Sequence, residues 1–216
     1  MFLASADPYV EAYRSMREGT LYLFIAWILV GIGLSLMVFS LLLRGSLLLV
    51  DKGPRAVLGV FPGGLVVAAL MTLVGAIMAL IGLWGKFLPG VKKLASVNPE
   101  FSTASTLVNT GLFWGLVLIL VGVPLLIFLV GGFLILVGYI LLVLGWIGML
   151  ILCLKLSDLE KNSLYLVAGI LFILSIFLSI LDFVAWILLY VALGDSISKR
   201  MRAPPTPTPT TLLPPV

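Results

Sequence analysis

The stretch that decides the fold runs from Leu107 to Leu154 and reads LVNTGLFWGLVLILVGVPLLIFLVGGFLILVGYILLVLGWIGMLILCL, without one charged residue. As a single helix its roughly 48 residues would be about 72 Å long, whereas the hydrocarbon core of a bilayer is about 30 Å thick. The stretch must therefore turn inside the protein. We expect the turn at Gly131-Gly132, which leaves two apolar spans, residues 107–130 and 133–154, with a kink at Pro124 in the first.

Three further apolar stretches are long enough to cross a membrane, namely residues 21–43, 57–85 and 164–193. Apolar residues make up 62% of the chain and charged residues only 10%, whereas soluble domains are about one quarter charged. The sequence therefore predicts an all-α integral membrane bundle of five transmembrane helices, occupying residues 21–194, in a cell membrane that the chain crosses several times.

The two ends of the chain differ from the spans. Asp7 and Pro8 are typical of a helix N-cap and first helical residue. Apolar and charged residues then alternate at helical spacing up to Gly19, which predicts a short amphipathic helix within residues 1–20, lying in the membrane interface. Residues 195–216 begin with a basic juxtamembrane cluster and continue as a Pro/Thr-rich tail, for which we expect disorder.

The net charge of +4 comes from 13 basic and 9 acidic residues, and the basic residues are spread over all loops. This pattern favours the lipid bilayer as partner and argues against nucleic acid. Five spans would place the two termini on opposite sides, with seven basic residues on the N-terminal side and six on the other. That tally leaves the orientation open.

The residue types that carry most enzyme chemistry are missing from the sequence. It has no histidine, and its one cysteine, Cys153, lies in an apolar run. No pair of carboxylates occurs within a span, and no glycine cluster has the context of a phosphate loop. We therefore expect no catalytic residue, no metal ligand and no cofactor, and a protein that is not an enzyme.

Asp182 is the one ionisable residue deep inside a predicted span. In a continuous helix, Ser175, Ser179, Asp182, Trp186 and Tyr190 would share one face, which we expect to line the bundle interior. An acid within a membrane is a candidate proton or cation site, or half of an ion pair, for which Arg44 is the basic partner in reach. The alternative is a buried carboxyl satisfied by Ser179, Ser175 or a tyrosine. The candidate polar site is thus Asp182, Ser179, Ser175 and Tyr190.

Glycines recur through the spans, as in Gly111-Leu-Phe-Trp-Gly115. Small residues four apart let helices approach closely in lipid. They predict a compact bundle or, alternatively, a face for a homo-oligomer.

Several short motifs resemble one family of membrane proteins. They are Arg17-Glu18-Gly19-Thr20, Val97-Asn98-Pro99-Glu100-Phe101-Ser102-Thr103, Leu156-Ser157-Asp158-Leu159-Glu160-Lys161-Asn162-Ser163, and Trp186 to Gly194 before the proline-rich tail. The family they resemble is an uncharacterised archaeal, mainly crenarchaeal, multi-pass membrane protein family, domain of unknown function 973. The resemblance implies an archaeal cell membrane and no known activity. Where similar proteins carry proline or an apolar residue, this chain has Asp182.

Two functions remain open from the sequence. The first is a structural, accessory or assembly component of a membrane complex, with membrane-protein partners or further copies of itself. The second is a small transporter or channel subunit that uses the polar stripe around Asp182. Transporters commonly contain helices broken near the membrane midplane, and Pro124 is the one interruption that the sequence suggests.

Overall fold

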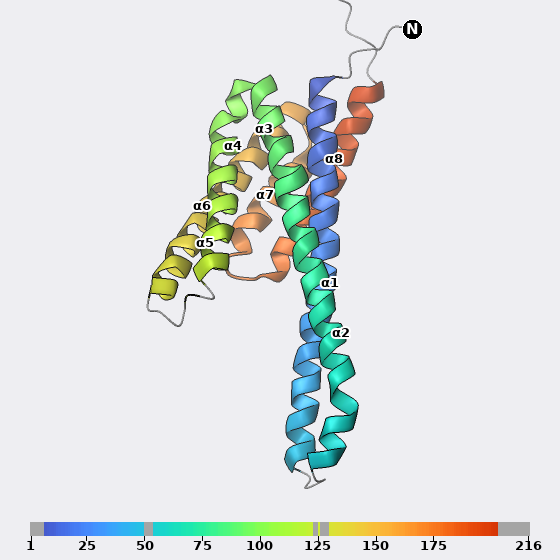
Figure 1. The fold of residues 1–216 in the computed structure, drawn as a ribbon. Coiled ribbons are helices and arrows are strands. Elements are labelled where there is room, and N and C mark those ends of the chain that lie inside the picture. Colours follow the sequence, from blue (N-terminus) through green and yellow to red (C-terminus); the bar gives the residue numbers. More distant parts are fainter. Residues whose placement is uncertain (1–6, 50–53, 123–124, 126–129, 203–216) are drawn as a thin grey trace, which may run out of the picture.

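The computed structural model describes residues 7–49, 54–122, 125 and 130–202. All regular structure in this part of the chain is helical (Figure 1). The elements, in chain order, are α1 (Pro8–Leu49), α2 (Pro54–Leu80), the π-helix η1 (Ile81–Phe87), α3 (Leu88–Val97), the 3₁₀-helix η2 (Pro99–Phe101), α4 (Ser102–Val108), the π-helix η3 (Asn109–Trp114), α5 (Gly115–Gly122), α6 (Val130–Glu160), α7 (Ser163–Leu174) and α8 (Ile180–Arg202).

Five helical stretches in the described residues are long and apolar enough to cross a membrane, which confirms the predicted five-helix membrane fold. They are Pro8–Ser40, Gly64–Val97, Pro99–Gly122, Val130–Glu160 and Ile180–Arg202. The second and third stretches each combine α-helix with a π-helical segment and stay continuous.

The N-terminal helix is present and starts as its sequence predicts. Asp7 Oδ1 accepts a hydrogen bond from the backbone N–H of Tyr9 at 3.0 Å, and α1 begins at Pro8. The helix does not end at Gly19, however, but continues to Leu49. Gly19 instead allows a close approach to η1, because a Cβ there would lie only 2.6 Å from the backbone nitrogen of Phe87.

The turn within the long apolar stretch lies earlier than predicted. α5 ends at Gly122 and α6 begins at Val130, so Gly131 and Gly132 are helical. Gly131 is buried where α6 meets α5, since a Cβ on Gly122 would lie 3.0 Å from the Gly131 carbonyl oxygen. Gly131 therefore serves packing, and neither glycine reverses the chain. The predicted kink at Pro124 lies outside the described residues.

The predicted fifth span, residues 164–193, is not one helix. α7 ends at Leu174, the chain turns through residues 175–179, and α8 begins at Ile180. The two helices pack together as a hairpin (Figure 1). The Ser175 hydroxyl donates to the Phe172 carbonyl at 2.7 Å and the following amides bond three residues back, which ends the α-helical pattern.

This hairpin places the start of α1 and the end of α8 at the same end of the bundle, where Arg200 pairs with Asp7 at 3.4 Å. The predicted separation of the two ends on opposite sides is therefore wrong, because α7 adds one more reversal of direction. Of the 13 basic residues, only Arg44, Lys52 and Arg55 lie in the sequence near the far tip of the α1–α2 hairpin. The other ten belong to the end that carries Asp7 and Arg200, which we call the terminal end.

The buried core lies in the half of the bundle nearest the terminal end. Its members come from the first part of α1, η1, α3, α4, the second part of α6, α7 and α8. Beyond this core, α1 and α2 continue as a two-helix hairpin past the other helices (Figure 1). We call residues 35–49 and 54–72 the distal hairpin. Where its side chains are described, its outer surface is apolar and exposed, as at Phe39 and Leu70.

Candidate functional site

Asp182 lies in the first turn of α8, immediately after the break between α7 and α8. Its Oδ2 accepts hydrogen bonds from two indole N–H groups, Trp27 Nε1 at 3.0 Å and Trp186 Nε1 at 3.1 Å. Trp186 is one helical turn further along α8, whereas Trp27 comes from α1. A negative charge is also favoured in the first turn of a helix by the helix dipole. The carboxylate is therefore held by groups that can only donate.

Aromatic packing fixes the start of α8 against α1 around this carboxylate. Phe183 stacks on Phe24 with ring centroids 5.1 Å apart, and the Trp186 ring meets Phe172 edge-on at 4.8 Å. Phe87 of η1 covers Trp186 from another side at 5.2 Å. The position of Asp182 is thus set by rings from four different helical elements, and not by the α7–α8 turn alone.

A cavity of about 380 Å³ adjoins Asp182. Its walls come from α1, α2, η1, η3, α5, α6 and α8, and among the described residues that line it Asp182 is the only ionisable one. Three indole rings contribute to the wall, those of Trp27, Trp146 and Trp186, and the rest is mainly leucine. The site is therefore a largely apolar space with one carboxylate at its edge.

The structure does not assemble the polar stripe expected from the sequence. Ser175 is buried but bonds to the Phe172 carbonyl, and Ser179 is exposed in the turn, where its carbonyl accepts from the Asp182 N–H at 3.2 Å. Tyr190 lies beneath the guanidinium of Arg17, 4.5 Å from its ring centroid. The break at residues 175–179 removes the two serines from the helix that carries Asp182, whereas Tyr190 stays on α8 but packs against Arg17 of α1. The side chain of Arg44 lies outside the described residues.

Trp27 is the residue of the candidate site that the sequence did not indicate as a partner of Asp182. It lies 155 residues from Asp182 in the chain, and an apolar helix offers no local signal for such a pairing. Trp186, by contrast, belonged to the predicted stripe, and its spacing of four residues from Asp182 is retained because both lie in α8.

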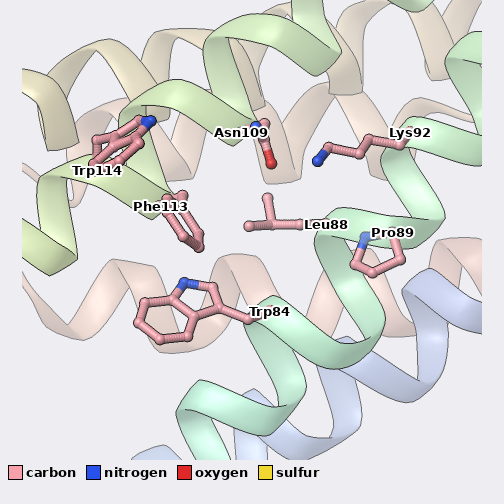
Figure 2. A pocket seen from close by; sticks show the side chains of 7 residues that line it. All are labelled: Trp84, Leu88, Pro89, Lys92, Asn109, Phe113 and Trp114. Carbon is pink, nitrogen blue, oxygen red and sulfur yellow. The ribbon is translucent and has the colours of Figure 1, made fainter.

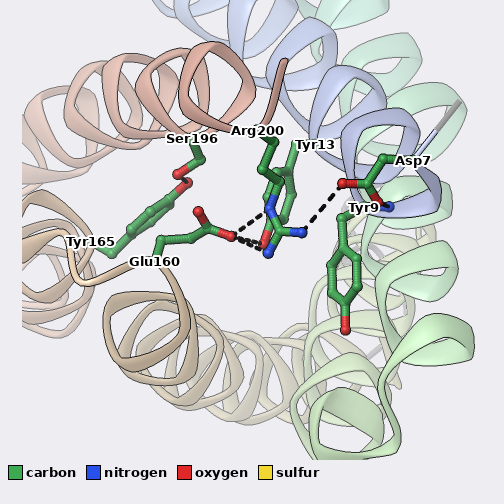
Figure 3. Close-up of polar contacts among 7 residues, drawn as sticks. All are labelled: Asp7, Tyr9, Tyr13, Glu160, Tyr165, Ser196 and Arg200. Carbon is green, nitrogen blue, oxygen red and sulfur yellow. Dashed lines mark hydrogen bonds and ion pairs between the residues drawn. The ribbon is translucent and has the colours of Figure 1, made fainter. Parts of the chain in front are cut away.

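A cluster at the terminal end was also not foreseen. Glu160 Oε1 accepts hydrogen bonds from Arg200 Nε at 2.9 Å and Nη2 at 2.6 Å, and from the Tyr13 hydroxyl at 2.7 Å (Figure 3). The Arg200 guanidinium also lies over the ring of Tyr9. A carboxylate oxygen that accepts three hydrogen bonds from two other helices is suited to joining α1, α6 and α8.

A second pocket, of about 300 Å³, lies between the two π-helical segments (Figure 2). Trp84 of η1 faces Phe113 of η3, with ring centroids 5.1 Å apart. Asn109 and Lys92 point into the same space from the rim. Trp84 Nε1 is buried without a hydrogen-bond partner in the described structure. π-Helical turns are frequent at functional sites, which makes this pocket a secondary candidate.

No group of three or more potential metal-ligating side chains occurs in the part of the chain that the structure describes. The Cys153 thiol is buried between α6 and α7, where it lies against Gly169. The arrangement at Asp182 can therefore bind a cation or a hydrogen-bond donor directly through one carboxylate.

Comparison with known proteins gives a family and no activity. One family model matches residues 9–216, which is nearly the whole chain. The protein belongs to the DUF973 family. The description of that family is "protein of unknown function", and the resemblance seen in the sequence motifs is thereby confirmed. No curated protein and no solved structure matches this DUF973 chain. Function must therefore be inferred from the site of the DUF973 protein itself.

Proposed function

We propose that this chain is a small transporter subunit of the cell membrane that binds a hydrophobic organic cation in the cavity at Asp182. The observation that carries the proposal is the single carboxylate at the edge of an otherwise apolar cavity. An acid inside a membrane is costly unless it has a partner. Its two indole bonds both fall on Oδ2, which leaves Oδ1 for a ligand.

The chemistry of the cavity wall supports a cation with apolar substituents. Indole rings attract cations over their faces, and rings of Trp27, Trp146 and Trp186 share the wall with Asp182. A bare metal ion would need several oxygen ligands, and the wall supplies one carboxylate. An amine or quaternary ammonium with alkyl or aryl groups fits both the charge and the apolar lining.

The helix break supports transport as well as binding. The apolar part of α8, from Ile180 to Leu193, is about 20 Å long, so the turn before it lies within the roughly 30 Å core of a bilayer. The turn itself is exposed at Phe177 and Leu178 and does not line the cavity, whereas Asp182, in the first turn of α8, does. Transporters place substrate sites at helices broken in this way. The sequence alone suggested an interruption only at Pro124.

The distribution of basic residues supports a cytoplasmic terminal end. Ten of the 13 Lys and Arg residues belong to that end once the α7–α8 hairpin is taken into account. Short loops rich in Lys and Arg stay on the cytoplasmic side. Cysteine labelling from outside intact cells tests this: a cysteine at position 161 is expected to resist a membrane-impermeant maleimide until the cells are opened.

The test of binding is a fluorescence titration with tetraphenylphosphonium, because three of the five tryptophans line the cavity. The probe is expected to quench the tryptophan signal of the wild-type protein in lipid nanodiscs. Asp182→Asn retains an oxygen that accepts both indole bonds but removes the charge. It is expected to weaken binding about tenfold or more, since the cation then lacks its counter-charge in an apolar site.

Asp195→Asn is the matched control, since Asp195 lies on the same helix, pairs with Lys199 and is remote from the cavity. It should bind the probe as the wild type does. Uptake of radiolabelled tetrapropylammonium into proteoliposomes then separates transport from binding. Equal affinity of the wild type and Asp182→Asn for tetraphenylphosphonium contradicts the proposal, as does uptake that is unchanged in Asp182→Asn.

A second candidate function is favoured by the distal hairpin, whose exposed apolar surface extends past the other helices. It suits a non-enzymatic accessory or assembly component, with membrane-protein partners or a second copy of the chain on that surface and no nucleic acid. Gentle detergent extraction followed by mass spectrometry tests it. Recovery of a defined partner supports this role, and recovery of the chain alone as a monomer contradicts it.

A further inference from the structure

A groove between α1 and α8 runs from the terminal end towards the membrane interior. Its outer part is a hollow of about 280 Å³ that includes Arg14, Arg17 and Glu18. Its inner part is a hollow of about 240 Å³ lined by Leu21, Phe24, Ile187 and Tyr190. Leu21 and Tyr190 belong to both hollows, so the two form one continuous groove.

The outer part of the groove is positively charged. No carboxylate lies within ion-pair distance of Arg14 or Arg17 in the described residues. Glu18, the one acid in the lining, is held by Lys86 Nζ at 2.8 Å. Arg17 is kept in place by the ring of Tyr190, and its Nε is buried without a hydrogen-bond partner. Two guanidinium groups are thus available for an anion.

The inner part of the groove is apolar and lies deeper along both helices. Phe24 is about one turn beyond Leu21 on α1, and Ile187 is about one turn beyond Tyr190 on α8. The charged part of the groove therefore lies at the level of the membrane surface, and its apolar part lies at the level of the acyl chains. A soluble anion would use only the outer half of such a groove.

We propose that this groove binds one anionic phospholipid, with its phosphate at Arg14 and Arg17 and an acyl chain along Leu21, Phe24 and Ile187. The guanidinium fork suits phosphate oxygens, to which it donates two parallel hydrogen bonds. The concentration of basic residues at the terminal end also attracts anionic lipid to this leaflet. The site is distinct from the cavity at Asp182, since no residue that lines the groove also lines that cavity.

Native mass spectrometry of the full chain tests the proposal with three additions: phosphatidylglycerol, phosphatidylcholine and inorganic phosphate. The wild type is expected to retain one phosphatidylglycerol and to retain phosphatidylcholine at least about fivefold less, because only the former carries net negative charge. Arg14→Gln combined with Arg17→Gln should abolish this preference. Lys199→Gln removes one basic residue from the same end, outside the groove, and should leave the preference unchanged.

Ile187→Trp keeps both arginines and fills the inner hollow, so it tests the acyl half even if the double variant fails to fold. It should lower phosphatidylglycerol retention about fivefold. Equal retention of the two lipids by the wild type overturns the proposal, and so does unchanged retention by Ile187→Trp. Inorganic phosphate that binds as a lasting adduct and competes with the lipid would show a free-anion site instead, which also overturns it.

Discussion

The half of the molecule near the terminal end and the distal hairpin both consist of membrane-spanning helices but are held together differently. Near the terminal end, Tyr13, Phe87 and Leu156 are fully buried, and charged groups join three helices at Glu160. In the described part of the distal hairpin, α1 packs against α2, as where a Cβ on Gly64 would lie 3.6 Å from Ser40 Oγ. Apolar composition alone therefore does not determine packing in a membrane, where lipid is as apolar as the helices.

The largest effect is expected from breaking the cluster at Glu160. Arg200→Met removes the guanidinium that donates two hydrogen bonds to Glu160. The Glu160 side chain, which is only 6% exposed, then has no cation beside it. Loss of one partner of a buried pair costs about 3–5 kcal/mol. Thermal unfolding in detergent should show a strongly lowered midpoint. Lys93→Met breaks the exposed pair with Glu11 and is expected to leave the midpoint almost unchanged, because solvent screens exposed ion pairs. Equal losses of stability in the two variants would contradict the conclusion that the buried pair at Glu160 stabilises the fold more than the exposed pair.

A smaller effect is expected from the two buried indoles. Trp186→Phe removes a hydrogen bond to the Asp182 carboxylate, and bonds to charged groups contribute about 1.5–3 kcal/mol. Trp84→Phe is the matched control, because it replaces the same ring but removes an indole N–H that has no hydrogen-bond partner in the described structure. Stability measured by denaturant-induced unfolding should fall clearly more for Trp186→Phe. The reverse order would show that Asp182 is not held by Trp186.

Glycines sharpen the comparison between packed and open helix surfaces. A Cβ on Gly148 would lie 2.7 Å from the backbone nitrogen of Val108, whereas a Cβ on Gly132 would meet nothing within 4 Å. Gly148→Ala is expected to destabilise by about 1–3 kcal/mol through overpacking. Gly132→Ala is expected to stabilise by about 0.5–1 kcal/mol, because alanine favours helix. Both substitutions lie in α6, so the midpoints of thermal unfolding of the two variants can be compared in the same detergent. Equal midpoints would contradict the prediction.

The smallest effect is expected in the distal hairpin. Val67 and Leu70 are about half exposed on α2, and truncating either to alanine removes little protein contact. Each change should alter the free energy of unfolding by less than about 0.5 kcal/mol. A loss of more than 1 kcal/mol, together with a change in the mass of the detergent-solubilised particle, would mean that another protein covers this surface.

Much of the fold could be predicted because long apolar runs have few alternatives in a bilayer. The N-cap at Asp7 and the long helix that contains Trp146 follow from local residue types. The break at residues 175–179 could not be predicted, because the segment Ser175 to Ser179 contains neither proline nor glycine. Its signal is only a serine hydroxyl that bonds to the carbonyl three residues earlier. Such bonds are common within helices too.

The sequence could predict two residues of the candidate site but not how the site is assembled. Asp182 stands out as an acid in an apolar run, and Trp186 follows it at helical spacing. Ser175 and Ser179 would share a face with Asp182 only in a helix without a break, and Tyr190 is taken up by its contact with Arg17. Trp27 belongs to the site through tertiary packing, which a single sequence does not reveal.

The pairing of α1 with α8 also sets an order for biosynthesis. The indole of Trp27 and the carboxylate of Asp182 are separated by 155 residues, which a ribosome adds in about 8–30 s at about 5–20 residues per second. During that interval the face of α1 that will receive α8 has only lipid against it. Among the described helices, α1 is thus completed by α8, the last of them in the sequence, and a chain released before α8 would leave Trp27, Phe24 and Arg17 without these partners.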